Sequence, residues 1–170
     1  MSNHPMRRHK RQIHDRQHLA AILNACEYGH LALCDGNEPY VVALNYTWVE
    51  ENGRDVFFFH SAPAGRKIDC LRANPRGCFM VETGVKLIVP TPPDNCLWTT
   101  HFQSVVASGT ISIISDQAEQ KAALNVFMRR FAPDITDFAY PPHLIGKMVM
   151  LKMIVDDLKG KQLPTPPSAC

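Results

Sequence analysis

The 170-residue sequence lacks any long apolar run, because charged residues or prolines interrupt each candidate well before the roughly 18 residues that a membrane-spanning helix needs. It also lacks an apolar leader at its N-terminus and any internal repeat of useful length. Hydrophobic residues make up 45% of the positions and charged residues 20%, as in ordinary globular domains. We therefore expect one globular domain in the cytoplasm, with no membrane partner.

Metal-binding and disulfide patterns are also missing. None of the cysteines forms a C-x-x-C pair, and a chain of this length buries about 70% of its surface without needing disulfides or a structural metal. His14 and His18 have the spacing of a metal pair but lack the glutamate of H-E-x-x-H. We expect no metal, and reduced, mostly buried thiols at Cys26, Cys34, Cys70, Cys78, Cys96 and Cys170.

The net charge of +2 depends on one short segment. Arg7, Arg8, Lys10 and Arg11 fall within five positions, and the rest of the chain has 14 basic residues (18 less these four) against 16 acidic ones. The segment is short and has no interleaved aromatic residues, which favours a solvated tail over a nucleic-acid arm. We therefore expect a flexible segment over residues 1–14 and no nucleic-acid partner, with the arm as the alternative.

Periodicity predicts an α+β unit that is mainly β and mostly antiparallel. Asp15 can cap a helix over 16–27, a short helix follows residue 65, and Asp116 begins a third that Pro133 ends. Three successive phenylalanines at 57–59 favour a strand at the centre of the sheet with both faces covered. Gly109 predicts a bend where a long strand curves around a barrel. The strands are expected at about 30–34, 39–48, 55–60, 77–82 with a continuation to 89, 100–114 and 145–155.

The loop Ser61–Lys67 carries a hydroxyl, a glycine and two adjacent cations at the start of a helix. Helix N-termini attract anions, and Gly65 would let the backbone approach a ligand closely. Arg66 could grip two phosphate oxygens, while Lys67 could add a point charge. The loop therefore indicates either a phosphate site or a capped surface helix with solvated cations, since it matches no Walker or G-x-G-x-x-G pattern.

A second pattern is Leu44-Asn45-Tyr46. It lies on the expected strand over 39–48, which forms a hairpin with the strand over 30–34. The amide and the phenol could meet a planar heteroaromatic ring against an apolar strand. The alternative is a tyrosine that fills the core.

Together these residues resemble a known family. The run Tyr40-Val41-Val42-Ala43-Leu44-Asn45-Tyr46, followed by Phe58-Phe59-His60-Ser61-Ala62-Pro63-Ala64-Gly65-Arg66-Lys67, is similar to the flavin-binding split barrels related to pyridoxamine 5′-phosphate oxidase. The nearest likeness is to the nitroimidazole-resistance, or Nim-type, proteins. The resemblance covers about residues 15–160 and continues weakly through Phe102-Gln103-Ser104-Val105 and Gly109.

The resemblance implies a six-stranded antiparallel split β-barrel with flanking helices over 15–160 and a homodimer with FMN at its interface. Separately, Pro164, Pro166 and Pro167 predict a flexible tail over 161–170. Two departures from the family pattern are Ala43 in place of proline and Phe102 in place of tyrosine. The residues implied to contact FMN are Leu44, Asn45 and Tyr46 at the ring, His60, Ser61, Arg66 and Lys67 near the phosphate, and Gln103 and Ser104 from a later strand.

The function implied is that of an FMN-dependent oxidoreductase that reduces a small electrophilic or nitroaromatic substrate. The alternative is a flavin- or haem-binding protein of the same fold with no turnover of its own. No acid–base pair is evident in the sequence, so no catalytic residue is assigned. The role of His60, the one group here that could exchange a proton near neutral pH, stays open.

Overall fold

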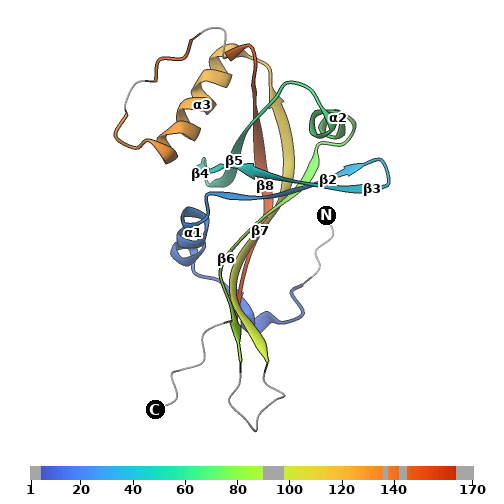
Figure 1. The fold of residues 1–170 in the computed structure, drawn as a ribbon, viewed down its shortest axis with the longest axis vertical. Coiled ribbons are helices and arrows are strands. Elements are labelled where there is room, and N and C mark those ends of the chain that lie inside the picture. Colours follow the sequence, from blue (N-terminus) through green and yellow to red (C-terminus); the bar gives the residue numbers. More distant parts are fainter. Residues whose placement is uncertain (1–4, 90–97, 136–137, 142–144, 164–170) are drawn as a thin grey trace. The chain divides into compact units, whose positions relative to one another are not determined.

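The computed structural model describes residues 5–89, 98–135, 138–141 and 145–163 (Figure 1). The helices in this part of the chain are α1 (Arg16–Ala25), α2 (Arg66–Ala73) and α3 (Gln117–Phe131), with a 3-10 turn at His9–Arg11. None of them is long and apolar enough to cross a membrane. The strands are β1 (Gln12–Ile13), β2 (Tyr28–Asp35), β3 (Glu38–Asn45), β4 (Thr47–Glu51), β5 (Arg54–Ser61), β6 (Arg76–Ile88), β7 (Thr99–Ile114) and β8 (Val149–Leu163).

The strands form one sheet in the order β3-β2-β6-β7-β8-β5-β4, with β1 paired to β8. β2 with β3, β4 with β5, and β5 with β8 are antiparallel pairs. The expected α+β, mainly β class with an antiparallel split barrel is confirmed. The described residues hold eight strands instead of the six expected, partly because the strand predicted over 39–48 is two strands: β3 pairs with β2, and β4 pairs with β5.

The chain divides into two compact units, each built from segments that are distant in sequence. Unit 1 takes in the described residues of Met1–Cys26, Met80–Val106 and Lys159–Cys170, and unit 2 those of Glu27–Phe79 and Ala107–Leu158. β6, β7 and β8 each contribute residues to both units. The units are therefore not two consecutive domains.

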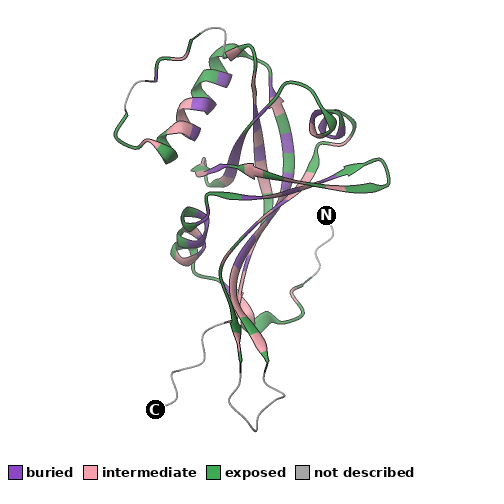
Figure 2. Cartoon of the chain, in the orientation of Figure 1, coloured by how far each residue is buried: buried purple, intermediate pink, exposed green. Residues whose placement is uncertain are grey.

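The core of unit 2 lies on both faces of β5, whose residues Val56, Phe57, Phe58 and Phe59 are all buried (Figure 2). On one face, Phe57 and Phe59 pack with Phe79 and with Tyr46. On the other face, Val56 and Phe58 belong to a cluster with residues of α3 and β8. Both faces of this strand are covered, as expected, but its place at the centre of the sheet was wrong: β5 is next to last, because the edge strand β4 pairs with it.

The predicted helix starts are confirmed by their caps. The Asp15 carboxylate accepts a hydrogen bond from the backbone N–H of Gln17 at 3.0 Å, and the Asp116 carboxylate accepts one from the N–H of Glu119 at 2.8 Å. Each bond satisfies one of the donors that a helix N-terminus leaves without an intrahelical partner.

Several boundaries differ from those expected. β8 covers 149–163 instead of 145–155, and it pairs through Lys161 and Gly160 with Gln12 and Ile13 of β1. These four residues were assigned to a flexible segment or to the end of the domain, yet Ile13 is buried because the pairing covers its apolar side chain. The irregular excursion expected around Pro90 and the tail beyond residue 163 lie outside the described residues.

Gly109 marks a close backbone approach within β7, which remains one strand. A Cβ atom added there would lie 2.2 Å from the Ile154 carbonyl oxygen, nearer than real Cβ atoms come. The position therefore needs glycine for space on the β8 side.

Among the described cysteines, Cys26 and Cys70 are buried, Cys78 is partly buried and Cys34 is exposed, all as free thiols. Burial raises the pKa of the Cys70 thiol, which keeps it protonated. The expectation of buried thiols therefore holds for Cys26 and Cys70 and was wrong for Cys34, which lies one residue before the end of β2. Cys96 and Cys170 lie outside the described residues.

Candidate functional site

The start of α2 has unsatisfied backbone donors. Gly65 is the N-cap residue, its φ of 113° is one that other residues rarely adopt, and it has no side chain with which to cap the helix. Its carbonyl oxygen accepts hydrogen bonds from the N–H groups of Ile68 and Asp69. Among the described residues, the N–H groups of Arg66 and Lys67 have no hydrogen-bond acceptor. The helix N-terminus therefore presents two free donors and the positive end of the helix dipole.

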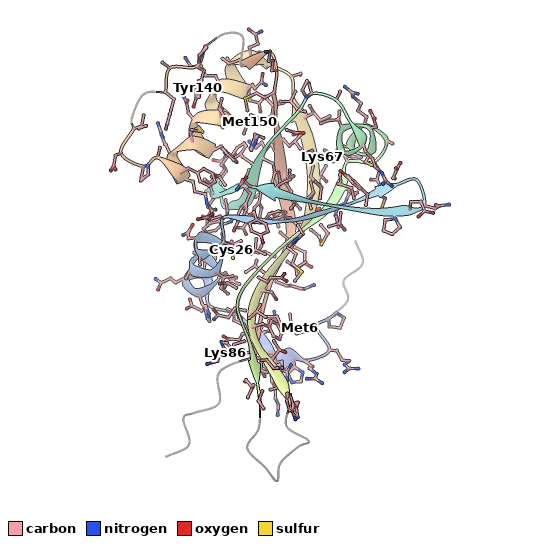
Figure 3. The ribbon with its side chains drawn as sticks, in the orientation of Figure 1. Met6, Cys26, Lys67, Lys86, Tyr140 and Met150 are labelled. Carbon is pink, nitrogen blue, oxygen red and sulfur yellow. The ribbon has the colours of Figure 1, made fainter. Side chains whose placement is uncertain are left out.

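Lys67, labelled beside α2 in Figure 3, is the partly buried cation of this site. Burial lowers its pKa from the ordinary value, and no carboxylate within the described ranges forms an ion pair with it. A cation that loses solvent without gaining an anionic partner is energetically unfavourable in the free protein. This position can therefore gain more from an anionic ligand than an exposed lysine can.

His60 interacts electrostatically with Lys67. Burial and then the positive charge of Lys67 lower the pKa of His60, so its imidazole stays neutral to a lower pH than usual. The ring stands edge-on to Phe127 of α3, with 5.2 Å between the centroids. His60 therefore packs against α3, and the charge of Lys67 at the start of α2 acts on its ring.

Arg66 is engaged elsewhere. Its Nε donates to the Asp35 carboxylate at 2.7 Å, and its guanidinium lies 4.7 Å from the centroid of the Tyr40 ring. Asp35 and Tyr40 belong to the β2–β3 hairpin, so Arg66 extends over that hairpin while Lys67 interacts with His60. Both members of the ion pair are about half exposed, which makes the pair weak enough for a ligand to displace.

The side chains of Leu44, Asn45 and Tyr46 point in different directions. Leu44 and Asn45 are successive residues of β3, so their side chains point to opposite faces. The Asn45 amide donates to the Glu27 carbonyl oxygen at 3.0 Å. Tyr46 is 0% exposed and packs against Phe57 and Phe79, as the core alternative predicted.

Ser61 is also turned inward. It is 6% exposed, and its hydroxyl donates to the Ala62 carbonyl oxygen at 2.9 Å. It is adjacent to His60 on β5, so the two side chains point to opposite faces of the strand. Of the two, His60 is the accessible one.

Gln103 and Ser104 belong to unit 1. Ser104 is buried, and the Gln103 amide contacts the His18 ring nitrogen at 2.6 Å and the Gln162 side-chain oxygen at 3.4 Å. Within the described residues, no group of three or more possible metal ligands occurs in either unit.

In unit 2, Lys67 thus lies at the start of α2 with its charge acting on His60 of β5, while Arg66, the preceding residue, is turned toward Asp35. Sequence reasoning missed Asp35 and Tyr40 as partners of Arg66. No sequence signal reveals an ion pair between residues 31 positions apart, although Asp35 and Tyr40 both lie on the hairpin that the sequence predicted. Chemically, the free amides and the lysine ammonium suit a phosphate group.

Comparison with known proteins identifies the family of the chain. A sequence model of the family described as pyridoxamine 5′-phosphate oxidase matches residues 15–162. The chain belongs to the pyridoxamine 5′-phosphate oxidase family. No curated protein matches it.

Solved structures share the fold of this pyridoxamine 5′-phosphate oxidase family member. A candidate 5-nitroimidazole antibiotic resistance protein from Bacteroides thetaiotaomicron is 27% identical, with a TM-score of 0.73 over 89% of this chain and 86% of that one. An FAD- and haem-binding protein from Mycobacterium smegmatis is 17% identical, with a TM-score of 0.78 over 94% and 77%. An FAD-binding protein from Mesorhizobium loti is 21% identical, with a TM-score of 0.62 over 91% and 98%.

Proposed function

We propose that this protein binds FMN and uses it as an oxidoreductase that reduces a small electrophilic or nitroaromatic substrate. The observation that carries the proposal is the start of α2, where free backbone N–H groups and the partly buried Lys67 lie together without an anionic partner. Bound FMN would supply the transfer of hydride or electrons to the acceptor, while the protein binds and orients the reactants.

The residues present fit the phosphate of FMN. The N–H groups of Arg66 and Lys67 would donate to phosphate oxygens, and the Lys67 ammonium would balance part of the negative charge. Arg66 would join them by exchanging the Asp35 carboxylate for the phosphate, since that ion pair is exposed. His60 would remain neutral and offer one N–H donor near the same group.

For the ring of the flavin, the contribution of β3 is narrower than the sequence pattern suggested. Leu44 would offer apolar contact, Asn45 would do so only by leaving the Glu27 carbonyl oxygen, and Tyr46 would contribute its backbone because its ring is in the core. Gln103 and Ser104 remain proposed contacts from β7. Neither a proton donor nor a proton acceptor for the substrate is assigned.

A homodimer is part of the proposal. β3 lies at one end of the sheet order, and none of its residues is fully buried. Val41 on this strand is 58% exposed, and Val85 and Leu87 on β6 are 65% and 57% exposed. Exposed β-branched and aliphatic side chains on strands are typical of surfaces that a partner covers.

The nitroaromatic substrate class rests on the likeness to the Bacteroides protein, a candidate for resistance to 5-nitroimidazole antibiotics. The test is to release the cofactor from native protein, identify it by mass and visible spectrum, and follow NAD(P)H oxidation with a 5-nitroimidazole. Release of FMN together with acceptor-dependent oxidation is expected. If the purified protein contains no flavin and does not bind added FMN, the proposal is wrong.

A second proposal is a flavin- or haem-binding protein without turnover. It is supported by the structural neighbour from Mycobacterium smegmatis, which is described as binding FAD and haem. Stable flavin binding with no oxidation of NAD(P)H across a panel of acceptors would favour it. A Soret band in the native protein would favour haem, and the mass of the released flavin separates FMN from FAD.

A further inference from the structure

Unit 2 contains an apolar cavity on the α3 side of β5, with a volume of about 280 Å³. Two of its lining residues, Leu124 and Phe127, belong to the same buried core cluster as Met150, which is labelled in Figure 3. Five of the side chains around the cavity are apolar and come from α3 or from the segment that leads into β8: Leu124, Phe127, Met128, Ile145 and Met148.

Two polar side chains complete the lining, His60 from β5 and Tyr140 from the segment after α3. The Tyr140 hydroxyl is buried and has no hydrogen-bond partner among the described residues. Its ring is stacked on the buried Phe138, with 6.0 Å between the centroids. A buried hydroxyl without a partner is unusual in native proteins, because leaving it unpaired costs free energy.

We propose that this cavity binds a neutral, mostly apolar ring compound that carries one hydrogen-bonding group. The hydroxyl of Tyr140, a lining residue, is itself covered, and it would reach that group by a small rotation of the side chain. A cavity of about 150 Å³ holds a benzene ring, so this one has room for a bicyclic compound. The site is distinct from the proposed FMN site, although His60 borders both.

Two electrostatic features favour a neutral occupant. Burial raises the pKa of Tyr140 and lowers that of His60, so both groups stay uncharged at neutral pH. A charged ligand would have to give up its hydration for a lining that offers no opposite charge, which is costly. A neutral ring loses little hydration and gains contact with the apolar side chains.

The first test uses indole and needs no mutation. In protein labelled at its methionine methyl groups, addition of indole is expected to shift the NMR signals of Met128 and Met148 in proportion to occupancy. Met80, in unit 1, serves as the internal control and should not move. If indole up to millimolar concentration moves neither Met128 nor Met148, or moves all methionines alike, the proposal is overturned.

The second test uses variants and calorimetric titration. Met128→Trp should fill the cavity and reduce indole affinity at least tenfold, whereas Lys121→Trp, at an exposed position of the same helix, should leave it unchanged. Tyr140→Phe should weaken indole about fivefold, the order expected for one hydrogen bond, and leave indene unaffected, since indene has the same shape without the N–H. Equal affinity in the two tryptophan variants would refute the site.

These measurements are independent of the flavin. Indole binding is measured by methionine signals and heat, so protein that contains no flavin gives the same answer. A protein that binds FMN but not indole would refute the cavity proposal alone. The reverse result would refute the proposed function alone.

Discussion

Replacing Lys67 with methionine tests the phosphate site most directly. Lys67→Met keeps the length and the apolar stem of the side chain and removes its charge. In the free protein Lys67 is partly buried and has no anionic partner within the described residues, so the substitution removes an unfavourable burial. We therefore expect the melting temperature of the flavin-free protein to stay the same or rise.

The substitution should lower the affinity for FMN strongly, and it should do so only through the contacts with the phosphate. A hydrogen bond to a charged group contributes about 1.5–3 kcal/mol, and a value of about 2 kcal/mol is suitable for a partly buried lysine. Because about 1.4 kcal/mol corresponds to a factor of ten, the Kd for FMN should rise about thirtyfold. Riboflavin has the same ring and ribityl chain without the phosphate, so its Kd should not change.

The assay is a titration of flavin-free protein, followed by the quenching of flavin fluorescence. Lys86→Met is the matched control, because Lys86 is an exposed lysine on β6. If Lys67→Met weakens FMN and riboflavin equally, Lys67 supports the fold or the ring and not the phosphate. If neither ligand is affected, the start of α2 is not the phosphate site.

Three further predictions concern neighbouring features. Asp35→Asn frees the Arg66 guanidinium and should tighten FMN about twofold, in line with about 0.5 kcal/mol for an exposed ion pair; an unchanged Kd would mean that Arg66 stays out of the site. His60 has a lowered pKa in the folded state, so the unfolded state binds more protons below about pH 6.5, and the free energy of unfolding should fall as the pH falls through that range. His60→Gln should reduce the difference between the free energies of unfolding that urea titrations give at pH 7.5 and 5.5. An unaltered difference would contradict a lowered pKa of His60 as its cause. Gly109→Ala should lower the free energy of unfolding by about 3 kcal/mol because its Cβ meets the backbone of β8, whereas Gly146→Ala, in open space, should not; equal urea midpoints would refute the close approach.

Local signals in the sequence predicted most of the elements. Asp15 and Asp116 are side-chain caps that accept hydrogen bonds from backbone N–H groups two and three residues further on. Such features depend on residues a few positions apart, which is why sequence reasoning finds them.

The switch between β3 and β4 could not be predicted in the same way. The sequence over 39–48 is uniformly suited to a strand, and nothing local marks Tyr46 as the point where the chain changes partner. Tyr46 is in the core because Phe57, Phe79 and the guanidinium of Arg130, 4.3 Å from the ring centroid, surround it. These contacts come from three distant segments, so only the assembled unit reveals the break.

Contacts between distant segments also explain why the two cations of the proposed site differ. Sequence reasoning directed both Arg66 and Lys67 to the phosphate, yet successive residues on a helix point about 100° apart. That rotation directs Arg66 to the exposed Asp35 carboxylate, while Lys67 is partly buried and its charge acts on His60. In the free protein Arg66 is already neutralised by a weak pair, while Lys67 has lost solvent and gained no partner. The free energy of phosphate binding should therefore come mainly from Lys67 and the backbone donors. Because partly buried charges are screened less than exposed ones, FMN affinity should fall only slightly as salt is raised.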